Sequence, residues 1–231
     1  MTILGIDSAS VSCSVGVLKG DREYEQFVNN GLTHSQTLLP LIDEVTKNAE
    51  ICASDIDLIA ITKGPGSFTG LRIGMATAKG IAAPFDIPCV CISTLEAIAA
   101  TASNGFEGIL CAVMDARCKQ VYNAIFECKN GELIRLCEDR ALSIADLEED
   151  LKKYDKPITL CGDGFKVCDS IFSDFEYKIA DEQFRFPHGK DICRLGEKYK
   201  DKSLPAEKIT PTYLRLPQAS RELIKKRGSL K

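Results

Sequence analysis

The stretch Gly64–Gly74, GPGSFTGLRIG, constrains the fold more than any other part of this sequence. An apolar, β-branched run precedes it (58–62) and a run of small residues follows it (75–83), an order that predicts a strand, a tight glycine turn and a helix. Ser67 or Thr69 can cap that helix. Such a turn leaves N–H groups free at the helix start, so it is either purely structural or a place for an anion or a partner's carboxylate.

The elements expected along the chain form two similar sets. The first has strands at 2–7, 15–18, 23–28, 58–62 and 87–92, with helices at 35–48 and 94–101 and a helix of small residues after the glycine turn. A comparable order restarts after residue 105. Each set opens with an apolar strand that ends in an aspartate, Asp7 in the first and Asp115 in the second. The repetition predicts an α/β fold of two lobes, residues 1–104 and 105–231, each a mixed sheet flanked by helices, with a cleft between them.

Charge and cysteine content narrow the function classes. A net charge of −4 and a pI near 5.4 argue against a protein that grips nucleic acid by itself. The eleven cysteines include no CxxC pair and the chain has only two histidines, so no zinc site is expected. With no secretory signal in the sequence and no apolar run of about 18 residues, the simplest expectation is a cytoplasmic protein without a membrane span.

The two aspartate loops are candidates for binding phosphate. A carboxylate can hold Mg²⁺ while the N–H groups of the small residues after Asp7 receive phosphate oxygens; the alternative is an aspartate that merely caps a turn. The glycine turn at residues 162–164, which follows a later strand of the second lobe, is a third part of this candidate site beside the two aspartate loops. The candidate nucleotide-binding residues are Asp7, Ser8, Asp115, Gly162, Asp163 and Gly164. Opposed aspartate loops of this kind resemble the phosphate grips of the actin, sugar-kinase and Hsp70 ATPase superfamily.

Five motifs in a fixed order carry a closer resemblance. They are GIDSAS at the start, HSQTLLPLIDEV from His34, GPGSFTGLRIG, MDAR…VY from Met114 and PTYLR from Pro211. Together they resemble the bacterial TsaB family of tRNA threonylcarbamoyladenosine biosynthesis. The resemblance implies the actin-like ATPase (ASKHA) fold and a non-catalytic scaffold or activator that forms a heterodimer with its catalytic paralogue TsaD. With the ATPase subunit TsaE, such a protein supports threonylcarbamoyl transfer to adenosine 37 of tRNA and meets tRNA only indirectly.

Departures from the catalytic pattern agree with a loss of chemistry. The metal site of the catalytic paralogue resembles an HxxxH helix motif, whereas His34 is followed four residues later by Leu38. Bulky Phe165 is expected to intrude where a nucleotide would pack, and His188 is expected to face solvent. We therefore expect no catalytic residue and no metal ligand in this chain, with ATP or ADP and Mg²⁺ bound only at low affinity or at the partner interface.

Two alternatives of other classes stay open. The main one is an active ATP-dependent phosphotransferase or ATPase that uses Asp7 and Asp115. A peptidase is the other, although neither histidine has a visible serine or metal-ligand partner in the sequence.

If chemistry is absent, surfaces carry the function. Apolar residues recur at helical spacing in 35–48, and small residues recur every four positions from Gly70, which lets another helix approach closely. The resemblance places both helices at the TsaB homodimer and TsaB–TsaD contacts, so that a homodimer formed alone competes with the heterodimer. The predicted interface residues are Leu38, Ile42, Val45, Leu71, Gly74 and Ala78. The basic tail from Arg215 to Lys231 is either a solvated end or a patch that helps a complex touch tRNA phosphates.

Overall fold

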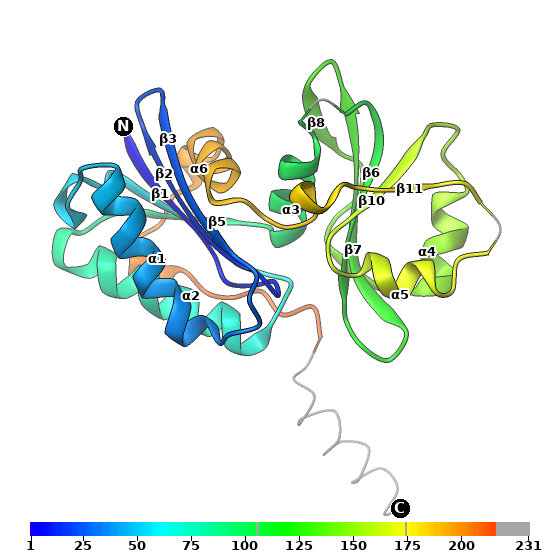
Figure 1. Cartoon of the computed structure of the whole chain (residues 1–231), viewed down its shortest axis with the longest axis horizontal. Coiled ribbons are helices and arrows are strands. Elements are labelled where there is room, and N and C mark those ends of the chain that lie inside the picture. Colours follow the sequence, from blue (N-terminus) through cyan, green and yellow to red (C-terminus); the bar gives the residue numbers. More distant parts are fainter. Residues whose placement is uncertain (105, 174, 216–231) are drawn as a thin grey trace, which may run out of the picture.

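The computed structural model describes residues 1–104, 106–173 and 175–215, which form two lobes side by side (Figure 1). The first lobe is built on a five-stranded sheet in the order β3-β2-β1-β4-β5. Its strands are β1 (Thr2–Asp7), β2 (Cys13–Lys19), β3 (Arg22–Val28), β4 (Leu58–Thr62) and β5 (Cys89–Ile92). The first three strands form an antiparallel meander, while β4 and β5 run parallel to β1, so the sheet is mixed.

Helices cover both faces of this first sheet. On one face lie α1 (His34–Asn48) and α2 (Phe68–Ala82), whose buried side chains join those of β1, β2 and β4 in one core. On the other face α6 (Gly189–Lys198) packs with Ile192 and Cys193 fully buried against the sheet. Glycines at 5 and 16 in the strands and at 189 and 196 in α6 allow this close approach, because a Cβ at any of them would meet the facing element.

The second lobe contains a six-stranded mixed sheet. Five of its strands follow the order β11-β10-β6-β7-β8, and β9 pairs with β7. The strands are β6 (Gly108–Asp115), β7 (Gln120–Lys129), β8 (Glu132–Arg135), β9 (Arg140–Ser143), β10 (Ile158–Cys161) and β11 (Lys178–Ile179). One face packs on α3 (Thr94–Ala102), and the other on α4 (Ile144–Leu151) and α5 (Phe165–Asp169). Short 3₁₀ turns occur at 53–55, 83–85, 182–184, 200–202 and 206–208.

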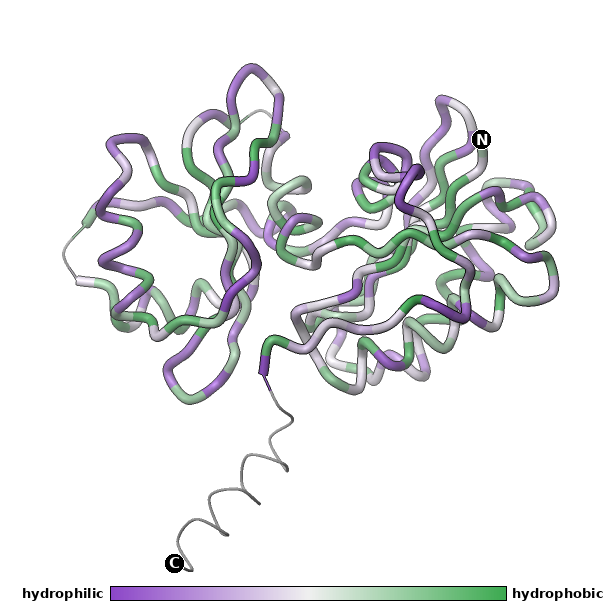
Figure 2. The backbone as a smooth tube through the Cα atoms, turned by 180° about the vertical axis from the view of Figure 1, so that it is seen from behind, coloured by the Kyte–Doolittle hydropathy of each residue, from purple (hydrophilic) through white to green (hydrophobic). Residues whose placement is uncertain are grey.

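The layered architecture of both lobes matches the sequence expectation. Both lobes are mixed sheets flanked by helices, as predicted, and hydrophobic residues concentrate along the strands while the loops are hydrophilic (Figure 2). Among the described residues, no helix has the length and apolar character needed to cross a membrane.

The division of the chain into 1–104 and 105–231 needs a correction. After the second lobe the chain returns to the first one, where α6 covers the sheet, Leu204 pairs with Cys89 beside β5, and Ile209 enters the core. Conversely, α3 precedes the predicted boundary but packs against the second sheet. The boundary differs because a sheet needs cover on both faces, and the sequence does not say which later helix supplies it. Residues 216–231 of the expected basic tail lie outside the described residues.

Candidate functional site

The glycine turn after β4 is packed against the loop that joins β1 to β2. Gly64 has φ 113°, a left-handed angle that favours glycine, and Ser67 caps α2 by accepting from Gly70 N at 3.2 Å. Ser67 N donates to Ala9 O at 2.8 Å. The backbone N–H and the hydroxyl oxygen of Ser67 are thus used within the first lobe, which agrees with the structural interpretation of the turn.

Asp7 is fully buried at the end of β1, with 0% of its surface exposed. Its Oδ1 accepts from Thr62 Oγ1 at 2.6 Å and from Ala9 N at 3.1 Å, and its Oδ2 accepts from Ser10 Oγ at 2.9 Å. Burial raises the pKa of this carboxyl, although the three hydrogen bonds act in the opposite direction. Both oxygens are therefore committed to the loop, which corresponds to the turn-capping alternative.

The loop after Asp7 also occupies the space beside α1 and α2. Ser8 Oγ donates to Gly70 O at 2.9 Å, and His34 Nε2 lies 2.9 Å from Ser10 O. A Cβ at Gly70 would overlap Ser8 O, and one at Gly74 would overlap Ser8 Oγ. The small residues of α2 accordingly make room for a loop of the same chain.

All six predicted interface residues lie inside the first lobe, which corrects the assignment of these side chains to a surface. Their positions on α1 and α2 face the sheet and each other, because the apolar stripe of each helix covers its own core. The fractions exposed are 1% for Leu38, 8% for Ile42, 0% for Val45, 1% for Leu71 and 0% for Ala78, and Gly74 is also buried. A partner that contacts these helices would meet their outward residues instead, such as Leu39 with 58% exposed.

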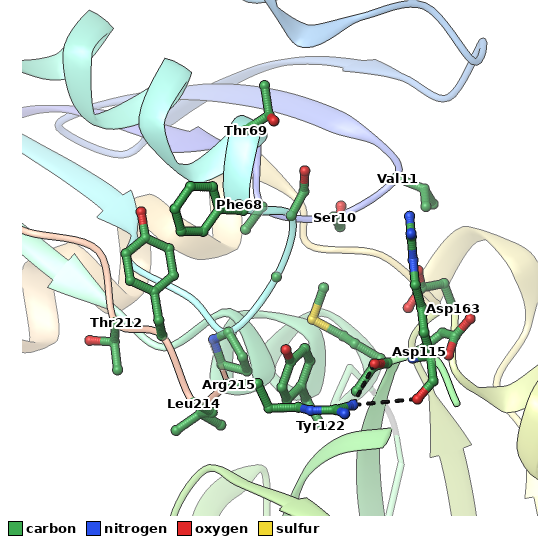
Figure 3. A pocket seen from close by; sticks show the side chains of 18 residues that line it. Ser10, Val11, Phe68, Thr69, Asp115, Tyr122, Asp163, Thr212, Leu214 and Arg215 are labelled. Atoms are coloured by element: carbon green, nitrogen blue, oxygen red, sulfur yellow. Dashed lines mark hydrogen bonds between the residues drawn. The ribbon is translucent and has the colours of Figure 1, made fainter. Parts of the chain in front are cut away.

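A pocket of about 480 Å³ opens between the two lobes (Figure 3). The first lobe contributes the β1–β2 loop (9–11) and the glycine turn (65–69), and the second contributes the end of β6 with Asp115, together with Tyr122 and Asp163. Residues 212–215 close one side. The pocket therefore lies at the carboxyl ends of β1, β4, β6 and β10, where both aspartate loops were predicted to meet.

Of the six candidate nucleotide-binding residues, Asp115 and Asp163 line this pocket. Asp163 Oδ1 is buried and has no hydrogen-bond partner among the described residues. Burial, with a further contribution from the negative charge of Asp115, raises the pKa of Asp163 to about 6. The structure thus brings together two carboxyl groups of the second lobe, while Asp7 and Ser8 are sealed behind the β1–β2 loop.

The turn that carries Asp163 is pressed onto β6. Gly164 N donates to Val113 O at 3.1 Å, and a Cβ at Gly162 would overlap the same carbonyl group. Phe165 does not line the pocket, which corrects the expectation that it intrudes there: it packs in the second lobe's core, with Arg185 Cζ 4.5 Å from its ring centre. These glycines serve close packing of one turn on one strand.

His188 was expected to face solvent, but the structure places it against β3. Its Nδ1 lies 2.9 Å from Glu25 Oε2, its ring stacks on Phe27 with centres 4.9 Å apart, and 18% of its side chain is exposed. The partners lie on β3, more than 150 positions earlier in the chain, so the polar sequence around His188 could not reveal them.

Sequence reasoning missed the pocket's aromatic and basic wall. Phe68, Tyr213 and Arg215 all line the pocket, and Tyr213 and Arg215 belong to the PTYLR motif. The motif indicated a family resemblance, but nothing in its local pattern shows that it reaches back to the cleft.

Comparisons with known proteins identify the family. A family model described as TsaD, tRNA N6-adenosine threonylcarbamoyltransferase, matches residues 31–223. The tRNA threonylcarbamoyladenosine biosynthesis protein TsaB of Bacillus subtilis is 29% identical over 228 residues, which are 97% of this chain and 98% of the relative. The protein of the same name from Buchnera aphidicola subsp. Schizaphis graminum is 34% identical over 194 residues, which are 82% of this chain and 90% of the relative. The chain belongs to the TsaB family.

A solved TsaB-type structure supports the same assignment. The protein titled YeaZ, from Pseudomonas aeruginosa, superposes with a TM-score of 0.81 at 26% identity, covering 92% of this chain and 99% of that one. The TsaB resemblance and the two-lobe actin-like fold are thereby confirmed. TsaB proteins are named for tRNA threonylcarbamoyladenosine biosynthesis, and family membership ties this chain to that pathway.

The pocket fits a nucleotide with bound Mg²⁺ poorly in this TsaB family member. A metal–phosphate grip needs carboxylate oxygens that are open to the ligand, but Asp7 is fully buried and both of its oxygens accept hydrogen bonds within the first lobe. Asp115 and Asp163 are the two carboxyl groups that remain in the lining. No group of three or more potential metal ligands occurs among residues 1–104, 106–173 and 175–215.

Proposed function

We propose that this chain is a non-catalytic subunit that pairs with a TsaD-like catalytic paralogue and supports threonylcarbamoyl transfer to adenosine 37 of tRNA. A TsaE-like ATPase completes the set of partners, and tRNA is contacted through the complex rather than by this chain alone. Isolated, the chain forms a homodimer through the surface that the catalytic paralogue would otherwise occupy.

The closed state of Asp7 is the observation that carries the proposal. A carboxylate that binds a metal or phosphate-bound metal must be open to the ligand, whereas Asp7 is fully buried and its two oxygens accept hydrogen bonds from Thr62, Ala9 and Ser10. The HxxxH position gives independent support: Leu38 lies in the core, and His34 contacts the carbonyl oxygen of Ser10. Nucleotide is accordingly bound at low affinity, or at a site that the partner completes.

The outward face of α1 and α2 is the surface that we assign to the partner. Leu39 projects from α1 with 58% of its surface exposed, and Ile73 of α2 is partly exposed. Apolar side chains on an outward helix face gain stability when a second helix pair covers them. The buried stripes of both helices hold that face in position from within the lobe.

Reconstitution tests the proposal. The extent of tRNA modification is measured with the catalytic paralogue and the ATPase subunit, with and without this chain, and with this chain alone. We expect modification to depend on the chain and the chain alone to give none. Equal modification without it would overturn the proposal.

The active-ATPase alternative is tested on the isolated protein. ATP turnover that saturates with substrate and falls in Asp115→Asn, but not in Asp155→Asn, would establish that alternative. Asp155 is a suitable control because it is exposed and lies outside the pocket. No turnover above that of a buffer blank is expected for any of the three chains.

A further inference from the structure

Residues 209–213 form a strap that is fixed to the first lobe. Ile209 is buried in the core of that lobe with 1% of its surface exposed. Thr212 N donates to Lys63 O at 2.7 Å, directly after β4. At Gly64 a Cβ would lie 2.5 Å from Thr212 O, so the glycine turn itself leaves room for the strap.

Tyr213 continues this attachment at the start of α2. Its ring packs on that of Phe68 with centres 4.5 Å apart, and Arg72 Cζ lies 4.0 Å from the centre of the Phe68 ring. Arg72 Nε donates to Tyr213 Oη at 3.3 Å. The three side chains hold the strap at the pocket mouth, so the position of the next residues is set from the first lobe.

Arg215 then crosses to the second lobe. Its Nη1 donates to Ala116 O at 2.6 Å and lies 3.4 Å from Arg117 O, in the turn between β6 and β7 (Figure 3). The turn contains three consecutive non-glycine residues with positive φ, 63° at Arg117, 57° at Cys118 and 55° at Lys119. This conformation is unfavourable for L-residues and persists when surrounding contacts fix it. The Arg215 guanidinium, which donates to the carbonyl groups of Ala116 and Arg117, is a contact that helps to fix this turn.

The covalent connections between the lobes lie elsewhere. The chain passes to the second lobe between β5 and α3 and returns before α6. Thr101 of α3 links the two passages, because its Oγ1 accepts from His188 N at 3.1 Å and donates to Asp191 Oδ2 at 3.0 Å. In Figure 1 these passages run beside α3 and α6, whereas the strap ends below them in the space between the lobes. The Arg215 contact therefore joins the lobes away from their covalent connections.

We propose that Arg215 is a latch that holds the two lobes in one relative position, and that the pocket between them changes width only when this guanidinium leaves the carbonyl groups of Ala116 and Arg117. The two chain passages beside α3 and α6 still permit one lobe to rotate relative to the other. A second attachment at a distance from them, here through Arg215, prevents that rotation. The latch goes beyond the proposed function, because it concerns the isolated chain and does not depend on any partner. It would let the chain keep a constant shape without a bound ligand.

The test measures the distance between the lobes in the full-length chain. Spin labels are introduced with a genetically encoded amino acid at Glu44 on α1 and Glu132 on β8, two exposed positions on different lobes, so that the eleven native cysteines stay unchanged. The labelled chain is diluted with an excess of unlabelled chain, so that only distances within one chain are measured even where two copies associate. The latch variants are Arg215→Ala and Arg215→Lys, and Arg22→Ala is the matched control at an exposed arginine at the start of β3. Amide hydrogen exchange of residues 116–120 is followed in the same chains.

A single narrow distance distribution is expected for the unchanged chain and for Arg22→Ala. Arg215→Ala should broaden it or add a second population, and should accelerate exchange in the turn about tenfold. Arg215→Lys should lie between, because an ammonium can also donate to these carbonyl groups but is more strongly hydrated than the guanidinium, so the contact with Ala116 and Arg117 is weakened rather than lost. If the alanine variant loses its circular dichroism spectrum, the lysine variant decides by the same criteria.

An Arg215 variant that is folded and retains the unchanged distance distribution and exchange rates would overturn the latch. This result is distinguishable from a failure of the proposed function, since neither measurement uses tRNA or a partner. Retained tRNA modification with a broadened distribution would uphold the latch and separate it from the activity of the complex.

Discussion

Asp7 shows how the environment of one residue decides between a catalytic and a structural role. The same carboxylate at the end of a strand can hold Mg²⁺ or organise a loop, and the three donors that surround Asp7 commit it to the loop. Removal of a buried acceptor leaves its donors without partners, and each such donor costs about 1–3 kcal/mol.

We predict that Asp7→Ala lowers the free energy of unfolding by at least about 2 kcal/mol, because Thr62 and Ala9 lose their acceptor. Asp7→Asn should stay within about 1 kcal/mol of the unchanged chain, since its amide oxygen can still accept both bonds. Urea unfolding at pH 7 measures both variants. Equal stabilities of all three chains would contradict the structural role of Asp7.

Asp163 gives a prediction on pH dependence. Burial, aided by the charge of Asp115, raises its pKa from an ordinary 3.8 to about 6, so between these values the folded chain holds a proton that the unfolded chain has released. Rising pH therefore favours the unfolded state, and stability falls through this window by up to about 3 kcal/mol. Asp163→Asn should abolish this part of the loss, as measured by urea unfolding at pH 4.5 and pH 7. Identical pH dependence in the two chains would exclude a raised pKa for Asp163.

At the scale of elements, α1 and α2 present one face to the core and another to the outside. Two adjacent leucines of α1 separate these faces, since Leu38 is 1% exposed and Leu39 is 58% exposed. Apolar spacing in α1 and small residues after the glycine turn predicted these two helices, but the residues selected as the interface lie on the inward stripes. On an amphipathic helix the most regular apolar stripe is the one that meets the helix's own core.

We predict that Leu39→Glu weakens association with the catalytic paralogue at least about tenfold while changing the stability of the chain by no more than about 0.5 kcal/mol. Leu38→Glu, the matched variant one position earlier, should destabilise the lobe by more than about 4 kcal/mol because it buries a charge. Thermal unfolding and analytical size exclusion with the partner measure both effects. Unchanged association of folded Leu39→Glu would remove this face from the interface.

On the scale of the whole molecule, the first lobe is completed by a segment from the far end of the sequence. With Ile192 and Cys193 fully buried on the sheet, α6 covers a face that is otherwise open to water. The 3₁₀ turns and the strap after it continue along the same lobe.

We therefore predict that a chain ending at residue 187 aggregates or loses its cooperative thermal transition, because one apolar face of the first sheet becomes exposed. A chain ending at residue 215 retains every described element and should unfold within about 3 °C of the unchanged protein. Circular dichroism melting and size exclusion make the comparison. A monomeric, cooperatively folding 187-residue chain would show that α6 is dispensable for the first lobe.

The sequence by itself determined the features that depend on neighbouring residues. Apolar and β-branched runs specified most strands, though not the short β9 and β11, and the glycine turn specified the join between β4 and α2. The ordered motifs specified the TsaB family and its two-lobe fold. These signals are local, because backbone propensity and hydrophobic periodicity act over a few residues.

Only the tertiary structure decided which surfaces meet. In the tertiary structure Thr62 donates to Asp7, and His188 lies against Glu25. The helix α6 packs on the first sheet, and Arg215 donates to the second lobe. Each of these contacts joins residues at least 55 positions apart in the chain. Local sequence patterns indicate that a face must be covered, but the covering element is chosen by packing and hydrogen bonding across the whole chain.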